Sequence, residues 1–191
     1  MDALKVLKSD HDTVRELFSQ FKKAKEADDT ERMQSVQQKI FSELEVHTSI
    51  EEEVFYPAAK DAGEDAEELI AEGIEEHHVV DVLMGEIRGL QPDDDAWAAK
   101  MTVLIENVEH HADEEEEELF PQLRKVFGDE QLEQLGSALQ QAKERRVGPS
   151  AAAETDLTRD ELYEKAKAAD VAGRSNMNKD ELADAVGEDA T

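Results

Sequence analysis

Apolar residues recur at every third or fourth position through most of the first 146 residues. This spacing is typical of amphipathic α-helices, and no segment alternates with the period of two that a half-buried strand shows. Short connections imply that neighbouring helices run antiparallel. We therefore expect an all-α protein, an up-down four-helix bundle with one extra helix. The predicted helices cover residues 4–21, 33–54, 66–87, 96–119 and 130–146, with Pro57 and Pro121 ending the second and fourth.

The pattern changes after residue 147. The run Gly-Pro-Ser-Ala-Ala-Ala that begins at Gly148 has the composition of a linker. Two short helical patterns follow, each opening with the spacing of a capping box, at Thr158 and at Asn178. The predicted organisation is a bundle over residues 1–147, a linker over 148–155 and a small helical tail module over 156–191.

The composition excludes several classes of site and partner. The 191 residues include 49 Asp and Glu against 21 Lys and Arg, a formal charge of −28. Such a charge repels phosphates, so we expect neither a nucleic-acid partner nor a membrane partner. Cys is absent, which excludes disulfides, thiolate ligands and iron–sulfur clusters. Because no apolar run could span a membrane and the first residues lack the apolar core of a signal peptide, we expect a soluble cytoplasmic protein.

The bundle sequence contains an internal repeat. A His-x3-Glu pair precedes an aromatic-Pro dipeptide twice, with an offset of 64. An earlier His on a matching apolar stripe occurs in each half, with an offset of 66. This register selects His77 over His78 and His111 over His110. The repeated residues are His11, His47, Glu51 and Pro57 in the first half and His77, His111, Glu115 and Pro121 in the second.

The spacing of these residues points to metal chemistry. Residues four apart lie on one helix face, so each His-x3-Glu pair offers an imidazole and a carboxylate to one interior point. The two earlier His lie on apolar stripes and also face inward. Buried carboxylates without partners cost several kcal/mol, which a metal would offset. A nitrogen and oxygen donor set suits Fe or Mn and permits Zn, and two ions bridged by both Glu would keep open positions. The predicted ligands are His11, His47, Glu51, His77, His111 and Glu115.

These six residues give the sequence a resemblance to a known family. Their order and spacing resemble the hemerythrin HHE cation-binding domain over about residues 3–145. The resemblance implies a non-haem di-iron centre with His11, His47, His77 and His111 as terminal ligands and with Glu51 and Glu115 as bridging ligands. Invertebrate oxygen carriers of this superfamily use five His, one Glu and one Asp, so this chain is more similar to bacterial HHE proteins.

The resemblance implies small oxidants as partners: O2, hydrogen peroxide or NO. Three interpretations stay open: a di-iron protein that binds or reacts with these molecules, with peroxide disproportionation as the best fit; an iron or oxygen sensor without turnover; and a mononuclear or Zn structural site. Catalytic residues are not identified, and no organic cofactor is expected. Additional members of the site could be Asp81 behind His77, Tyr56, His78 or His110. The flanking acids are expected to form a solvated collar; they are Glu52, Glu53, Glu114 and Glu116–Glu118.

The tail is similar to short helix–extended–helix modules such as the one at the N-terminus of transcription termination factor Rho. The similar segment runs from Leu157 to Leu182. Residues 150–191 carry 11 acidic and 5 basic side chains, a net charge of −6, so the basic footprint of a nucleic-acid binder is missing. We expect the tail to bind a protein partner or to be a simple appendage.

Overall fold

The computed structural model of the chain describes residues 1–92, 94–155 and 159–168. It divides into two compact units, Met1–Ala142 and Lys143–Thr191, which are treated separately below. Helices dominate the described residues, and no strand occurs among them, so the all-α prediction is confirmed. Within this part of the chain, no helix is both long enough and apolar enough to cross a membrane.

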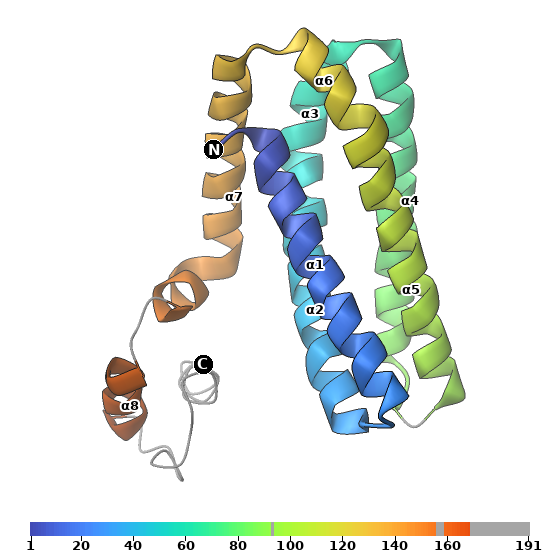
Figure 1. Ribbon diagram of the computed structural model, residues 1–191, viewed down its shortest axis with the longest axis vertical. Helices are drawn as coiled ribbons and strands as arrows, with labels where there is room; N and C mark the ends of the chain where they lie inside the picture. Colours follow the sequence, from blue (N-terminus) through green and yellow to red (C-terminus); the bar gives the residue numbers. More distant parts are fainter. Residues whose placement is uncertain (93, 156–158, 169–191) are drawn as a thin grey trace. The chain divides into compact units, whose positions relative to one another are not determined.

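Four long helices form the bundle of the first unit (Figure 1). They pack as two helical hairpins, the first with the second and the third with the fourth, in the order that the sequence predicts. Asp2 caps the first helix by accepting a hydrogen bond from the Lys5 amide, and Asp29 caps the second in the same way from the Arg32 amide. The four helices are α1 (Ala3–Glu26), α2 (Thr30–Ile50), α4 (Glu64–Arg88) and α5 (Asp95–Glu114).

The second and fourth helices do not end at their prolines, which corrects the predicted boundaries. Each continues through one π-helical segment into a further helical stretch. A proline is tolerated in the first turn of a helix because its missing N–H has no partner there, and both prolines occupy that position. The continuations are η1 (Glu51–Phe55), α3 (Tyr56–Ala59) and the 3-10 turn η2 (Lys60–Ala62) in the first half, and η3 (Glu115–Leu119) and α6 (Phe120–Val126) in the second.

The extra helix α7 (Asp129–Thr155) is longer than the predicted 130–146. It continues through residues 148–155, where the composition predicted a linker, and the three consecutive Ala at 151–153 are the strongest helix formers. Gly136 on α7 allows the chain's beginning to pack closely, because a Cβ there would come within 2.2 Å of the Met1 carbonyl oxygen. The domain boundaries stay predictions.

The second unit contains α8 (Arg159–Ala168), on which Leu162 and Ala166 are buried. The helix predicted from the spacing at Thr158 therefore exists, although Thr158 itself lies outside the described residues. The helix predicted at Asn178 and the Rho-like extended segment also lie outside them.

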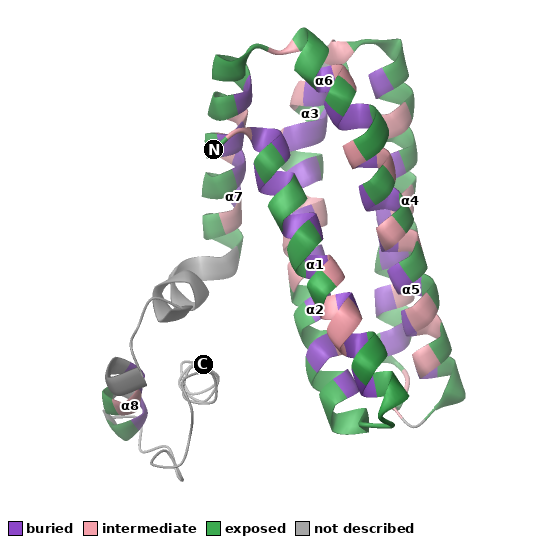
Figure 2. Ribbon diagram, in the orientation of Figure 1, coloured by how far each residue is buried: buried purple, intermediate pink, exposed green. Residues whose placement is uncertain are grey.

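Two apolar clusters fill the bundle and leave a polar level between them. One contains Val14, Phe18, Leu44 and Trp97, and the other contains Leu7, Ile50, Phe55, Ile70 and Leu119. Along every long helix the chain passes from one cluster to the other through a buried His. Buried residues recur along each of the four long helices (Figure 2). The fold therefore places all four His at one height in the core.

Candidate metal centre

The six residues predicted as ligands lie together in this polar level. Each is almost completely shielded from solvent, with exposed fractions between 0% for Glu51 and 5% for His111. They come from all four long helices and from the first residue of each π-helical segment. The internal repeat therefore folds into a single buried cluster of four imidazoles and two carboxylates.

The cluster contains two groups with the spacing of metal ligands, and the groups share Glu51. One comprises His11, His47, Glu51 and Glu115, and the other comprises Glu51, His77 and His111; within each group the donor atoms lie within 4.8 Å of one another. Glu51 Oε1 lies 3.2 Å from His47 Nε2, whereas Glu51 Oε2 lies 3.3 Å from His77 Nε2. The two oxygens of one carboxylate thus face different groups, as a bridging ligand requires.

Several buried polar atoms of the cluster lack a hydrogen-bond partner. Both carboxylate oxygens of Glu51 and of Glu115, together with Nε2 of His11, meet none. Nearby imidazole nitrogens approach to 3.2–3.3 Å without hydrogen-bond geometry. Buried polar groups are almost always satisfied, and an unpartnered buried carboxylate costs several kcal/mol. A cation bound between these atoms would satisfy them, so the donor set fits a metal site.

Each imidazole is backed by a further carboxylate on its Nδ1 side. The Nδ1–oxygen distances are 3.0 Å from His11 to Glu116, 2.9 Å from His77 to Glu52, 2.8 Å from His111 to Glu76 and 3.9 Å from His47 to Asp10. An Nδ1–H that donates to a carboxylate leaves Nε2 as the free donor atom. This hydrogen bond leaves Nε2 of His11, His77 and His111 to face the centre of the bundle, whereas Nδ1 of His47 is too far from Asp10 to form one.

These outer carboxylates occupy matching positions in the two halves of the repeat. Asp10 and Glu76 directly precede the first His of each half and lie on the Nδ1 side of the second His of the same half, where only Glu76 is close enough for a hydrogen bond. Glu52 and Glu116 directly follow the inner Glu and support the first His of the opposite half. The two halves thus support each other's imidazoles through a pseudo-twofold arrangement.

The hydropathy and motif patterns did not predict this arrangement. Glu52 and Glu116 were expected in a solvated collar, and Asp81 was the candidate behind His77. The structure exposes Asp81, and Glu52 accepts from His77 instead. Their sequence positions could have indicated these outer carboxylates, because each one is directly adjacent to a predicted ligand.

Two π-helical turns position the inner carboxylates. The Tyr56 N–H donates to the Glu51 carbonyl and the Phe120 N–H donates to the Glu115 carbonyl, both five residues back. Such π-turns are rare and occur often at functional sites. Here they come in matching positions, each beginning at a core Glu and followed by an aromatic-Pro dipeptide.

Charge at the centre is balanced by mutual contact. Burial acts to raise the pKa of Glu51, but the surrounding His47, His111 and His77 hold it well below its usual value. Burial acts to lower the pKa of His111, but the carboxylates of Glu51 and Glu76 raise it well above its usual value. A bound cation would compete with protons for these groups.

Glu116 is held more firmly than the other outer carboxylates. Lys8 and Arg15 both pair with it, and Arg15 Nη1 lies 2.6 Å from Glu116 Oε1. Burial would raise its pKa, but Lys8, Arg15 and His11 lower that pKa to about 2. Arg15 also pairs with Asp113, so this network ties α1 to α5 and η3 beside His11.

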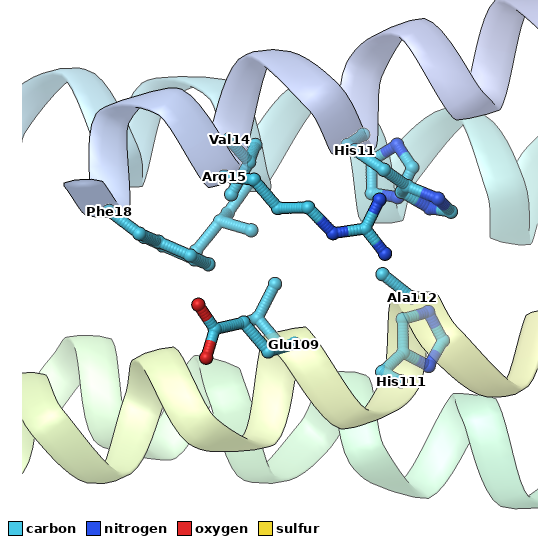
Figure 3. Close-up of a pocket in the computed structure, with 10 residues that line it drawn as sticks. His11, Val14, Arg15, Phe18, Glu109, His111 and Ala112 are labelled. Atoms are coloured by element: carbon cyan, nitrogen blue, oxygen red, sulfur yellow. The ribbon is translucent and has the colours of Figure 1, made fainter.

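Two small pockets reach the cluster from different sides. The first is mostly apolar and lies between α1 and α5, where Val14, Phe18 and Ala112 line it together with His11 and His111 (Figure 3). The second is more polar. It is lined by Tyr56, Leu69, Gly73, Glu76, His111, Glu114, Glu115 and Leu119.

Of the remaining candidates, the two His lie outside the cluster and the Tyr lies against it. His78 is exposed and is not part of the cluster. His110 is also exposed and groups at the surface with Glu76 and Glu114. Tyr56 is 1% exposed, and its hydroxyl lies 3.5 Å from His77 Nε2. Burial, Glu51 and Glu115 raise the pKa of Tyr56 well above its usual value.

The fold and the site define a class: a four-helix bundle whose core holds a buried cluster of His and Glu, from a duplicated hairpin, that could hold a metal. Comparison with known families agrees with this class. The hemerythrin HHE cation binding domain matches residues 2–123. The chain belongs to that family.

Two other proteins have sequences similar to this chain. A protein of Nostoc sp. named DNA nickase is 29% identical over 156 residues, which cover 79% of this chain and 42% of the relative. An uncharacterized hemerythrin-like protein of Schizosaccharomyces pombe is 27% identical over 130 residues, which cover 68% of this chain and 64% of the relative. The chain thus spans less than two thirds of either relative. No solved structure matches the sequence significantly.

Proposed function

We propose that this protein binds two iron ions in the bundle core and uses them to bind or react with small oxidants. Each ion would be held by two imidazoles, one by His11 and His47 and the other by His77 and His111. Glu51 would bridge the two, and Glu115 would be the second bridging carboxylate. The observation that carries the proposal is the position of Glu51, whose two oxygens face the two imidazole pairs.

Iron is favoured by the donor chemistry and by the family. Four nitrogens and two carboxylates without sulfur suit Fe or Mn, and Zn can also bind such a set. Hemerythrin HHE proteins form a cation-binding family, which supports a metal but leaves its identity to be measured. Mn and Zn are therefore the alternatives to iron in any metal analysis.

For the reaction, we propose hydrogen peroxide disproportionation, with O2 and NO as other ligands. Two peroxide molecules give one O2 and two waters, and a pair of redox metals supplies and recovers the two electrons that this exchange needs. The protein's own residues orient the site: the outer carboxylates hold the imidazoles of His11, His77 and His111, and the apolar clusters exclude bulk water. The polar and apolar pockets offer small molecules two routes to it.

Metal analysis of the iron-loaded protein tests this proposal. We expect two irons per chain and near-ultraviolet and visible absorption from a bridged ferric pair. Glu51→Ala removes the shared ligand and should abolish binding of the pair. Glu117→Ala, which changes an exposed neighbour in η3, should leave it intact. A colourless protein, or full two-iron binding by Glu51→Ala, would contradict the proposal.

A turnover assay distinguishes peroxide disproportionation from a sensor role. Oxygen evolution on addition of hydrogen peroxide would support disproportionation. Iron binding and an oxidant-sensitive spectrum without oxygen evolution would instead support an iron or oxygen sensor, whose state the tail could pass to a protein partner.

The activity named for the Nostoc relative is not part of this proposal. Residues 1–149 carry 38 acidic and 16 basic side chains, a net charge of −22, which disfavours a polyanionic substrate. The matched region also covers only 42% of that relative.

A further inference from the structure

Two positions beside the cluster differ between the halves of the repeat in a way that changes its polarity. Tyr56 in the first half corresponds to Phe120 in the second, at the same offset of 64 as the ligands. Gly73 in the second half corresponds to Leu7 in the first, at the offset of 66. Each imidazole pair therefore has a different neighbour, although the ligands themselves are repeated.

Tyr56 brings a hydroxyl to the His77 and His111 side of the cluster. Its ring stacks against the His77 ring at 5.6 Å between centroids, and its hydroxyl lies 3.5 Å from His77 Nε2. Glu115 lines the same pocket as Tyr56. The phenol O–H is thus a buried donor that lies among the predicted ligands.

Gly73 makes the space for this hydroxyl. A Cβ at position 73 would lie 2.9 Å from the Tyr56 oxygen and 3.2 Å from His111 Cε1, both closer than ordinary contact. Gly in the middle of a helix is destabilising relative to Ala, so its presence in α4 has a local benefit. That benefit is room for the Tyr56 hydroxyl beside His111.

The corresponding position in the other half is apolar. Phe120 stacks on His11 with 6.1 Å between centroids and brings no polar atom, and Leu7 is completely buried. Arg15 lines the apolar pocket on this side, but its guanidinium is paired with Glu116 and Asp113. The Tyr56 side of the cluster therefore offers a polar ligand a hydroxyl donor that the repeat does not reproduce beside His11.

We propose that the Tyr56 hydroxyl donates a hydrogen bond to the small anionic or peroxidic ligand of the centre, on the side of His77 and His111. Tyr56 is then the residue that recognises the ligand, and Gly73 is a positioning residue that admits the hydroxyl. The polar pocket lined by both of them leads to this position. This inference rests on the two-iron site proposed above.

Azide binding to the ferric, iron-loaded full chain tests the inference. Tyr56→Phe removes only the hydroxyl, so two irons per chain should remain while azide affinity, read from the absorption spectrum, falls about ten-fold. Adding Phe120→Tyr to this variant moves a hydroxyl to the other half and should not restore the affinity.

A cycle with Gly73→Ala adds a control for packing. Because the new Cβ displaces the hydroxyl, Gly73→Ala should weaken azide binding in the natural background but have little further effect in Tyr56→Phe. Equal azide affinities of the natural protein and Tyr56→Phe would overturn the inference. So would a phenolate-to-iron absorption band that Tyr56→Phe abolishes, because Tyr56 would then be a ligand. If the natural protein fails to bind two irons, the proposed function fails first and this inference fails with it.

Discussion

At the residue scale, the outer carboxylates should affect metal binding as well as the predicted ligands do. Glu76 accepts from His111 Nδ1 at 2.8 Å and so fixes which nitrogen faces the core. Such contacts also raise the basicity of the imidazole, and their loss costs 10–100-fold in metal affinity in known sites. The same reasoning applies to Glu52 behind His77 and to Glu116 behind His11.

This contact gives a direct prediction for Glu76→Gln. The amide is a weaker acceptor than a carboxylate, so we expect metal affinity to fall by about ten-fold or more without loss of the fold. Competition against a chromophoric chelator measures the affinity. Glu72→Gln, one turn earlier on α4 and exposed, is the matched control and should bind like the natural protein. Equal weakening in both variants would indicate a general charge effect instead.

At the element scale, the helices could be predicted from the sequence but the turns that aim Glu51 and Glu115 could not. Apolar periodicity located α1, α2, α4 and α5, because burial of one helix face sets that pattern. A π-turn adds a single residue to one turn and leaves no distinct hydropathy signal. The partners of Glu52 and Glu116 depend on contacts between helices, which a linear pattern does not encode. The six inner residues could be predicted from the sequence only because the same pattern occurs in both halves of the repeat.

The network around Glu116 connects α1 with η3 and predicts a pH dependence. The pKa of this carboxyl is lowered to about 2, below the 4.5 of an unperturbed Glu, so it stabilises the fold fully above about pH 4.5. That contribution should fade as the pH falls toward 2. The metal-free Glu116→Gln variant should therefore have a lower free energy of unfolding than the natural chain at pH 6.

The difference between the two unfolding curves should shrink steadily below pH 4.5. Denaturant titrations at several pH values measure it, and Glu117→Gln, which is exposed in the same turn, serves as the control. A difference that stays constant from pH 6 to pH 2 would show that Glu116 stabilises the fold by packing alone.

At the scale of the whole molecule, metal binding and stability should be linked. The metal-free bundle buries carboxylate oxygens that lack hydrogen-bond partners between two apolar clusters. A ligand that binds only the folded state adds about 2.7 kcal/mol when its free concentration is 100 times its dissociation constant. For a chain of this size each kcal/mol raises the Tm by roughly 2–4 °C.

We therefore expect iron loading to raise the Tm by several degrees and a chelator to reverse the change. The double variant Glu51→Ala, Glu115→Ala lacks both bridging candidates, and its Tm should not respond to iron. Thermal unfolding followed by circular dichroism provides the measurement. An equal response of this variant would place the stabilising metal elsewhere on the acidic surface.

The proposed chemistry depends above all on a pair of metal ions bridged by Glu51. X-ray absorption at the iron edge of the loaded protein is the decisive measurement. We expect a first shell of nitrogen and oxygen only, together with an iron–iron signal at about 3.5 Å, as in other two-metal sites. Iron with the same first shell but without an iron neighbour would contradict the bridged pair.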